Sequence, residues 1–387
     1  MSQVAAPTTL DIFRQWYEDS FTDFKLVREW KDVNAWHALG YFPVYFPVEL
    51  AEAFDTLPVA LYGAEGRINL DIAIAHTQSF VCTICKSVFQ LGAEKRLDAF
   101  DILVFSNICD VARNLSGIVK RNLLDKTIVY LHYPIHNDTE LAVSYLVDEY
   151  RRLVNILEET TGIKYDEERL REAIRLHNEK RRLIKILIDL RREKPWLVPF
   201  TEYYIVAKAA SIMPVEKYNK LLERYIGEVV KRDVRPADRL RILVKGNFCE
   251  QPPLMFMKTI EDAGAYIIED ESLIGQYWIG EVSIEGDPLL ELAKAYVSND
   301  VPLTVRYHPS LDKQEFIKRE IKEKNAEGVL FLSPKFCEPS LYDYIIYKKA
   351  LDEIHFPYLH LEYEETTSSF EHLRTMVETF VESIMFD

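Results

Sequence analysis

The sequence lacks several motifs that would place it quickly in a common class of enzyme. It contains no GxxxxGK[ST] loop, no GxGxxG after a predicted strand, and no HExxH, G-x-S-x-G or Cys–His nucleophile signature. We therefore expect that the chain neither hydrolyses ATP itself nor binds a dinucleotide in the usual way.

Long apolar runs and signal-like segments are also missing. No run of 18 apolar residues occurs, so no membrane-spanning helix and no membrane partner are expected. The first ten residues lack the basic start and apolar core of a secretory signal, and we expect a cytoplasmic protein.

Positive charge and cysteine are scarce. Lys and Arg number 47 against 62 Asp and Glu, which gives a net charge of −15 and argues against a nucleic-acid partner. The five cysteines are an odd, scattered set, so reduced thiols are expected rather than a disulfide framework. At 387 residues with 48% apolar content, the chain is a globular protein of two to three domains.

Short apolar runs alternate with helical patterns in the first and last thirds. The first ~40 residues look helical, and another helical stretch, 68–80, runs into Cys82. The strands we expect, typical of a buried parallel sheet, are 59–62, 101–105, 127–133, 241–245, 265–268, 303–307, 328–332 and 357–362. From 140 to about 232 the pattern is helical, and Pro195 is expected to stop the second helix.

These patterns predict an α/β protein with two Rossmann-like or flavodoxin-like parallel-sheet domains joined by a helical segment. The predicted boundaries are an N-terminal α/β domain at 1–139, a helical segment at 140–235 and a C-terminal α/β domain at 236–387. No internal repeat of solenoid length is found.

The cysteines are the most informative residues for chemistry. Cys109 lies just beyond the DILVF strand and Cys337 just beyond GVLFL, the positions where open α/β sheets build their sites. Cys82 lies in the same half as Cys109. Thiolates are the usual ligands of iron–sulfur clusters, but free cysteines are also commonly buried packing residues, and spacing alone leaves both interpretations open. The single pair Cys82-x-x-Cys85 is a weak signal for zinc.

Four stretches resemble the family of 2-hydroxyacyl-CoA dehydratase and benzoyl-CoA reductase subunits. They are GYFPVYFPVELAEAFDTLPVALYG (40–63), SFVCTICKS with LDAFDILVFSNICDVARNLSG (79–117), ILVKGNFCEQPP (242–253) and LFLSPKFCEPSLYDY with FPYLHLEYEE and LRTMVETFVE (330–382). The chain length and the GNFCEQPP stretch most resemble the smaller of the two cluster-bearing subunits of ATP-dependent benzoyl-CoA reductases. One departure is LRTMVE, where many relatives carry a second arginine, so no role is assigned to Met376.

The resemblance implies one [4Fe–4S] cluster, held by Cys82, Cys109 and Cys337 in the cleft between the two α/β domains. Cys85 is expected beside the cluster, or as the ligand that replaces Cys82, and Cys249 is expected to pack in the same cleft. The implied reaction is the reduction of an aromatic acyl-CoA to a cyclic diene with electrons from reduced ferredoxin. The implied partners are a paralogous cluster-bearing subunit, ATPase-type activator subunits and ferredoxin. Two alternatives are a 2-hydroxyacyl-CoA dehydratase subunit and a non-catalytic electron-relay subunit.

Several other residues have both a chemical and a structural interpretation. Lys86, Ser87, Asn107 and Glu338 lie near the proposed ligands and are candidates to tune them, or are solvated turn residues. His132, His136 and His308 are candidate proton donors, or satisfied histidines beside prolines. The basic residues at 180–182 and 191–192 either meet the phosphates of coenzyme A or form a solvated helix face.

Overall fold

Two parallel sheets form the core of the computed structural model, which describes residues 7–123, 125–246, 249–271, 279–299, 301–302, 304, 306–367 and 369–386. The N-terminal sheet contains β1 (His37–Tyr41), β2 (Thr56–Ala60), β3 (Ile102–Ser106) and β4 (Thr127–Leu131) in the order β2-β1-β3-β4. The C-terminal sheet contains β5 (Leu240–Lys245), β6 (Ala265–Asp270), β7 (Gly328–Pro334) and β8 (Tyr358–Tyr363) in the order β6-β5-β7-β8. All pairings are parallel, which confirms the predicted α/β class.

The two sheets repeat one topology. In each half the first strand pairs with the second and the third, and the fourth lies outside the third. This 2-1-3-4 order is the flavodoxin-like arrangement, whose ligand site lies at the carboxyl ends of the first and third strands. We call the halves built on these sheets the N-terminal lobe and the C-terminal lobe. The repeat exists in the topology although the sequence shows none.

Helices cover both sheets and connect the lobes. In the N-terminal lobe they are α1 (Thr9–Asp19), α2 (Lys25–Asn34), α3 (Val48–Glu52), α4 (Asp71–His76), α5 (Thr83–Ala93), the 3-10 turn η1 (Arg96–Ala99) and α6 (Asp110–Asn122). Between the sheets come α7 (Glu140–Thr161), α8 (Glu167–Glu193), α9 (Phe200–Ala209) and α10 (Val215–Val229). The C-terminal helices are α11 (Leu254–Asp262), α12 (Pro288–Val297), α13 (Lys313–Lys324), α14 (Glu338–Glu353) and α15 (Glu371–Met385).

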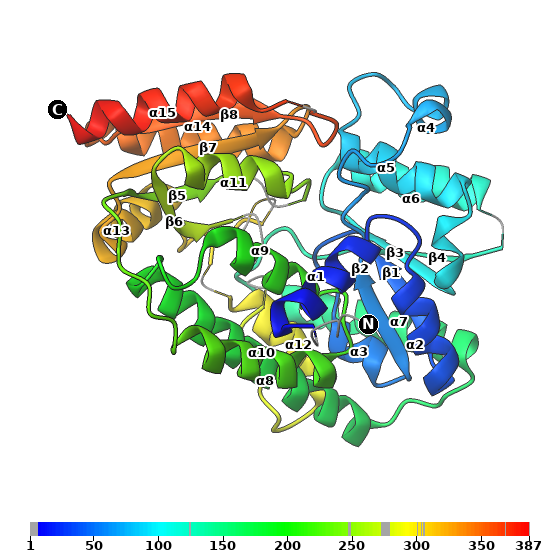
Figure 1. Ribbon diagram of the computed structural model, residues 1–387. Coiled ribbons are helices and arrows are strands. Elements are labelled where there is room, and N and C mark those ends of the chain that lie inside the picture. The colour runs from blue at the N-terminus through cyan, green and yellow to red at the C-terminus, as the bar shows by residue number, and fades with distance from the viewer. Residues whose placement is uncertain are drawn as a thin grey trace, which may run out of the picture.

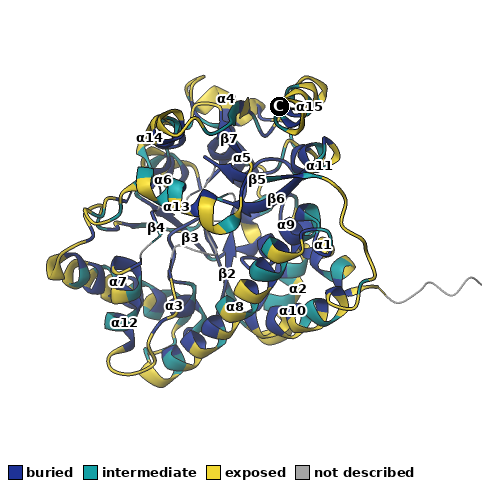
Figure 2. Cartoon of the chain, turned by 90° about the vertical axis from the view of Figure 1, so that its left-hand side faces the viewer, coloured by how far each residue is buried: buried dark blue, intermediate teal, exposed yellow. Residues whose placement is uncertain are grey.

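The strands lie at the centre and the helices outside them. Figure 1 shows the C-terminal sheet at upper left and the N-terminal sheet at right, with α8 and α10 along the lower edge. Every residue of β2, β3, β6 and β7 is buried, and Figure 2 shows the dark blue strands enclosed by helices with yellow outer faces. Burial on both faces explains why DILVF and GVLFL read as continuous apolar runs.

Local signals set the ends of the connecting helices. Thr139 caps the start of α7 by accepting a hydrogen bond from the Ala142 N–H, and Gly162 ends it in the left-handed conformation with φ of 74°. Asp166 caps α8, which ends at Glu193 just before Pro195, as predicted. The predicted domain boundaries at 139/140 and 235/236 stay a prediction.

Three sequence-based assignments were wrong. The expected helical stretch of the first ~40 residues ends at Asn34, because 37–41 form β1, a central strand. The predicted helix 68–80 is the short α4, and α5 after Cys82 was missed. The strand expected at 59–62 is β2, displaced to 56–60. In the strand expected at 303–307, residues 303 and 305 lie outside the described residues, and Tyr307 forms only an isolated bridge with His136.

Candidate functional site

All five cysteines line one cavity of about 260 Å³, although they are spread over more than 250 residues of the chain. The cavity-lining cysteines are Cys82, Cys85, Cys109, Cys249 and Cys337. The first three come from the N-terminal lobe and the last two from the C-terminal lobe, so the cavity lies between the lobes. All five are free thiols. The convergence of Cys82, Cys109 and Cys337 therefore needs the complete fold.

The topology explains how two of these cysteines meet. Cys109 lies three residues after β3, the third strand of its sheet, and Cys337 lies three residues after β7, the third strand of the other. They occupy equivalent positions in the repeated topology, and both face the site that flavodoxin-like sheets form at their carboxyl ends. Cys249 follows β5, the first strand of its sheet, at the same edge.

Each of the three predicted ligands is also the N-cap of a helix. Cys82 is the N-cap of α5, Cys109 of α6 and Cys337 of α14. The Cys109 sulfur accepts a hydrogen bond from the Ala112 N–H at 3.4 Å. Three helix N-termini thus point their partial positive charge at one cavity, an arrangement that favours thiolates and anionic groups.

Burial and hydrogen bonding set the protonation of the thiols. The Cys82 and Cys85 sulfurs lie 3.5 Å apart, and this hydrogen bond lowers the pKa of Cys82 and raises that of Cys85. Burial raises the pKa of Cys109 to about 11, and it also raises the pKa values of Cys249 and Cys337. In the absence of a bound cation, most of these thiols are therefore neutral.

The walls of the cavity are largely apolar. Phe80, Val81, Ile108 and Phe336 line it together with the cysteines. Phe80 and Phe336 keep 62% and 43% of their surface exposed, so they stand at the boundary with solvent. Within the described part of the chain, no three His, Cys, Asp or Glu side chains converge closely enough to share a single metal ion.

Two buried glutamates near the cavity were missed by the sequence reasoning. Glu250 lines the cavity, and its carboxylate accepts hydrogen bonds from the Ile84 N–H at 3.0 Å and the Glu365 N–H at 3.1 Å. Burial raises the pKa of Glu250 well above its usual value, and the pKa of Glu365 to about 6. In the sequence, the only indication of a role for Glu250 was its place in the stretch GNFCEQPP, and for Glu365 its place in LEYEE.

The four residues considered as tuning candidates have different surroundings. Glu338 lines the cavity, whereas Lys86 donates to the carbonyl of Ser79. Ser87 donates to the carboxylate of Glu365, and the amide of Asn107 donates to the carbonyl of Tyr133. Only Glu338 among the four therefore faces the cavity.

A second, larger cavity of about 590 Å³ adjoins the first and shares residues 108–110 with it. His132 lines it and is hydrogen-bonded to the Tyr145 hydroxyl at 2.9 Å. His136 lies 2.6 Å from the Asp138 carboxylate, and His308 is hydrogen-bonded to the Ser310 hydroxyl at 2.7 Å. Of the three histidines, only His132 lines a cavity that reaches Cys109.

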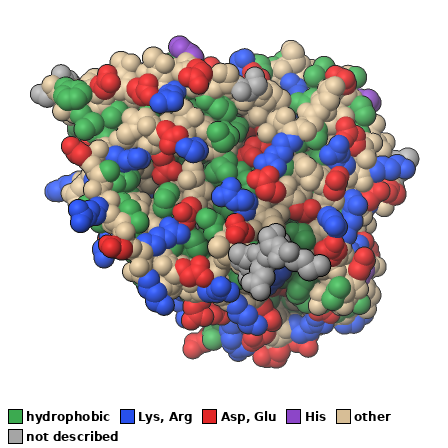
Figure 3. Space-filling model, in the orientation of Figure 1, with side chains coloured by type: hydrophobic (Ala, Val, Ile, Leu, Met, Phe, Trp, Pro, Cys, Tyr) green, Lys and Arg blue, Asp and Glu red, His purple; other side chains and the backbone are tan. Residues whose placement is uncertain are grey.

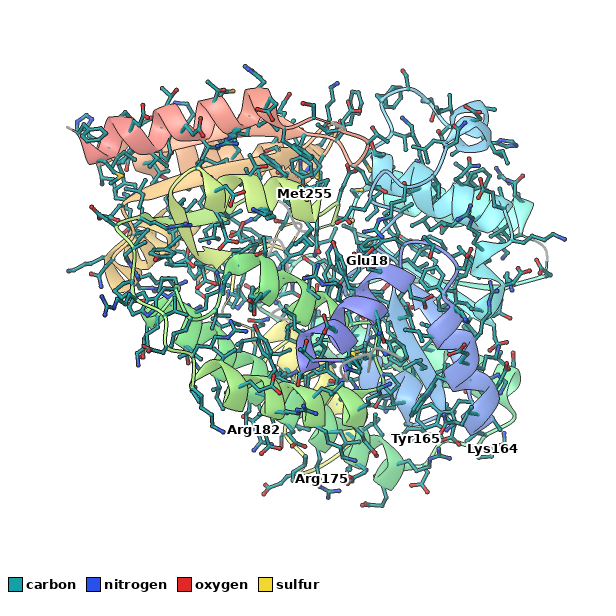
Figure 4. The ribbon with its side chains drawn as sticks, viewed as in Figure 1. Glu18, Lys164, Tyr165, Arg175, Arg182 and Met255 are labelled. Atoms are coloured by element: carbon teal, nitrogen blue, oxygen red, sulfur yellow. The ribbon has the colours of Figure 1, made fainter. Side chains whose placement is uncertain are left out.

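The basic residues of α8 are mostly used inside the protein. Lys180 donates to the carbonyl of Ala210, Arg181 pairs with Glu49, and Arg191 pairs with Asp270. Arg182 points outward at the lower edge of the molecule, as does Arg175 (Figure 4). These contacts do not agree with phosphate binding by the basic residues at 180–182 and 191–192 as a set. They do not agree with a fully solvated helix face either.

The surface carries charges of both signs. On the face shown in Figure 3, red and blue side chains alternate and no extended basic area is visible. Among the residues that the structure describes, none of the helices combines the length and apolar character needed to cross a bilayer.

Comparison with known proteins places these features in a family. Residues 43–384 match the family model described as 2-hydroxyglutaryl-CoA dehydratase, D-component. The chain is 33% identical to a benzoyl-CoA reductase subunit of Thauera aromatica, over 95% of this chain and 96% of the relative. It is 25% identical to lactoyl-CoA dehydratase subunit beta of Anaerotignum propionicum, over 93% and 95% of the two chains. It is 26% identical to (R)-2-hydroxyglutaryl-CoA dehydratase subunit beta of Acidaminococcus fermentans, over 90% and 92%. With a family match that spans most of its length and a near full-length relative at 33% identity, the chain belongs to the 2-hydroxyglutaryl-CoA dehydratase D-component family, and its role is that of an enzyme subunit.

Proposed function

We propose that this chain is a [4Fe–4S] cluster-bearing subunit of an ATP-dependent benzoyl-CoA reductase, with Cys82, Cys109 and Cys337 as the cluster ligands. The observation that carries the proposal is the convergence of these three cysteines on one cavity between the lobes. The near full-length similarity to the Thauera aromatica benzoyl-CoA reductase chain supports the choice of reaction.

The donor set fits such a cluster. Three thiols, each at a helix N-terminus, surround a cavity large enough for an inorganic group, and thiolates are the ligands that iron–sulfur clusters take. Cluster ligands bind different iron atoms, so they need not converge as closely as the ligands of one ion. The lack of a single-ion site among the described residues is consistent with this geometry.

When bound, a [4Fe–4S] cluster supplies one-electron transfer at a potential set by charge, hydrogen bonding and burial. The chain controls those three quantities. The three helix N-termini favour thiolate ligands, whereas the buried Glu250 adds negative charge when ionised. The apolar walls, with Phe80 and Phe336 at the boundary, limit the access of water. Three protein ligands leave one iron without a cysteine.

The division of labour in the complex follows from what the chain contains. The sequence has no phosphate-binding loop, so the ATP would be hydrolysed by separate activator subunits. An aromatic ring accepts an electron only at very low potential, which is why ATP is needed. Reduced ferredoxin would supply the electrons, a paralogous cluster-bearing subunit would pair with this chain, and the complex would work in the anaerobic cytoplasm.

A second candidate is a subunit of a 2-hydroxyacyl-CoA dehydratase, which recycles its electron. The family model and the two dehydratase beta subunits favour it. The purified complex can be assayed with benzoyl-CoA and with a 2-hydroxyacyl-CoA while ATP use is counted. Stoichiometric ATP hydrolysis with benzoyl-CoA supports the reductase, and catalytic ATP use with the hydroxyacyl thioester supports the dehydratase. No turnover of either with an intact cluster would indicate an electron-relay subunit.

The ligand assignment is tested by anaerobic purification of the complex with Cys109→Ala or Cys337→Ala, followed by iron and sulfide analysis. Both variants are expected to lose most of the iron bound by this chain. Cys249→Ala is the matched control, since Cys249 lines the same cavity and its variant is expected to keep the cluster. A full cluster in either ligand variant would overturn the assignment.

A further inference from the structure

Cys85 has no role as a ligand in the proposal above, yet its sulfur is hydrogen-bonded to that of the proposed ligand Cys82. Its sulfur lies 3.5 Å from that of Cys82, and the side chain is 1% exposed. Among the described cysteines, no other pair of sulfur atoms is hydrogen-bonded, although all five line the cavity. Among the five cysteines, a sulfur–sulfur hydrogen bond therefore distinguishes Cys82 and Cys85.

The local structure accounts for the contact. Cys82 is the N-cap of α5 and Cys85 lies in its first turn, so the two side chains project from the same face of the helix. A Cys-x-x-Cys pair at a helix N-terminus is the arrangement that supports thiol–disulfide exchange. A disulfide requires its sulfurs at about 2.05 Å, which a small rotation of the two side chains can provide from 3.5 Å.

The two thiols differ in solvent exposure, as thiol–disulfide exchange requires of an attacking and a resolving cysteine. Both residues line the cavity, but Cys82 is partly exposed, whereas Cys85 is buried. An oxidant entering the cavity therefore meets the more exposed Cys82 first, and the Cys85 sulfur lies 3.5 Å from that of Cys82.

We propose that Cys82 and Cys85 form a reversible disulfide when no cluster fills the cavity, and that this bond withdraws Cys82 from ligation. The oxidant is a small-molecule disulfide. The Cys82 thiolate attacks one sulfur of that disulfide, breaks its S–S bond and releases one thiolate. The Cys85 thiol gives its proton to the released thiolate and attacks the Cys82 sulfur, which releases the second small-molecule thiolate. That thiolate takes up from water the proton that Cys82 lost when it became a thiolate. Two protein thiols thus lose two electrons and two protons, and the small disulfide gains them.

The formation of the disulfide is independent of the proposed function, and only its effect on ligation rests on it. Oxidation would keep the cluster-free chain from binding iron at an incomplete site, and reduction would restore the ligand. The partly exposed Cys82 sulfur is the one that a reducing thiol can attack to restore the dithiol.

The test uses the full chain after iron removal by a chelator and full reduction under anaerobic conditions. The chain is treated with oxidised glutathione, the remaining thiols are alkylated, and the protein is digested with trypsin. Cleavage after Arg67 and Lys86 gives the peptide 68–86, which carries Cys82 and Cys85 and no other cysteine. We expect this peptide to be unalkylated and two hydrogens lighter than the dithiol form, with three of the five cysteines alkylated.

Three variants separate the possible outcomes. Cys85→Ser is expected to leave glutathione attached to Cys82, because the resolving thiol is gone. Cys249→Ser removes another buried cavity cysteine, and Cys337→Ser removes a proposed ligand; both are expected to keep the disulfide. A bond from Cys82 to Cys109 or Cys249, or full alkylation of both cysteines in the treated wild-type chain, would overturn the proposal.

Iron loading tests the second half of the proposal. The oxidised wild-type chain is expected to take up at least tenfold less iron and sulfide than the reduced chain, and dithiothreitol is expected to restore uptake. If the disulfide forms and the oxidised chain still takes up as much iron and sulfide as the reduced chain, the disulfide does not prevent cluster binding and this half of the proposal fails. If Cys109→Ala and Cys337→Ala keep their clusters while the disulfide still forms, the cluster assignment fails and the disulfide stands.

Discussion

Glu365 and Glu250 join the two lobes beside the cysteine cavity. Glu365 follows β8 of the C-terminal lobe, and its carboxylate accepts from the N–H groups of Ala64 and Gly66 at 2.6 and 3.2 Å and from the Ser87 hydroxyl. Gly63 leaves room for it, since a Cβ there would lie 2.8 Å from a Glu365 oxygen at a φ of +82°. These contacts hold the segment that carries Cys82 and Cys85 against the opposite lobe.

Replacement of Glu365 by alanine is expected to lower the free energy of unfolding by about 3 kcal/mol or more. The substitution leaves the buried N–H of Ala64 and the buried hydroxyl of Ser87 without their acceptor, and each such loss costs roughly 1–3 kcal/mol; the exposed Gly66 N–H loses the same acceptor but can turn to water. Urea unfolding of the cluster-free chain measures the change.

Glu364→Ala is the neighbouring control for this substitution. The Glu364 carboxylate pairs with Lys335 near the surface, so a change of less than about 1 kcal/mol is expected. Equal effects of the two substitutions would contradict the structural role assigned to Glu365.

At the scale of elements, three helix N-termini define the site. A cysteine at an N-cap can have two functions, since its sulfur can cap the helix and also face the cavity. For Cys109 the first function is visible in the hydrogen bond from Ala112, with sulfur as a weak acceptor. Substitution can separate the two functions because serine is a strong N-cap and alanine is not.

In the cluster-free chain, Cys109→Ser is expected to be about 1 kcal/mol more stable than Cys109→Ala. The serine hydroxyl keeps an acceptor for the first turn of α6, and the methyl group of alanine removes it. Urea titration of both variants gives the difference, and iron analysis is expected to show the same cluster loss in both. Equal stabilities would mean that the side chain at 109 does not cap α6.

The elements that the sequence predicted well are those with strong local patterns. DILVF and GVLFL are buried on both faces and became β3 and β7, and the helical period from 140 to 232 became α7 to α10. β1 was missed because its sequence, HALGY, is short and contains Gly40, and its strand character comes from pairing with β2 and β3. A Cβ at Gly40 would lie about 3.0 Å from Leu103, so close packing explains the glycine.

The cysteine cavity was only partly predictable. The positions of Cys109 and Cys337 after strands followed from the apolar runs, whereas Cys82 was placed by resemblance alone. α5 was missed, so neither the N-cap role of Cys82 nor its contact with Cys85 could be seen. Glu250 and Glu365 act through contacts between residues more than 100 positions apart, and the local patterns of a single sequence do not reveal such contacts.

At the scale of the whole molecule, α8 joins the two lobes through ion pairs. Near its middle, Arg181 pairs with the buried Glu49 of α3 in the N-terminal lobe. At its end, Arg191 pairs with Asp270 at 2.9 Å, and Arg192 pairs with Glu269, both on β6 of the C-terminal lobe. Because the cavity lies between the lobes, a helix attached to both fixes the positions of the cysteines on either side.

The contact of α8 with β6 makes stability sensitive to acid. Burial alone would raise the pKa of Glu269, but Lys324, Arg192 and Arg191 outweigh it and lower the pKa to about 2. A carboxyl group with a lowered pKa in the folded state contributes stability above its unfolded pKa of 4.5 and loses that contribution as the pH falls toward 2. The wild-type chain is therefore expected to lose about 2 kcal/mol from this group between about pH 5 and pH 3.

Glu269→Gln removes the titrating group, so its free energy of unfolding should fall less steeply over the same range. The variant is also expected to be less stable at neutral pH, because Lys324 and Arg192 lose a charged partner. Urea unfolding at about pH 5, 4 and 3 measures both effects, with Glu364→Gln as a surface control that keeps the wild-type slope. Parallel curves for wild type and Glu269→Gln would mean that the acid sensitivity of the chain arises elsewhere than at the junction of α8 and the C-terminal sheet.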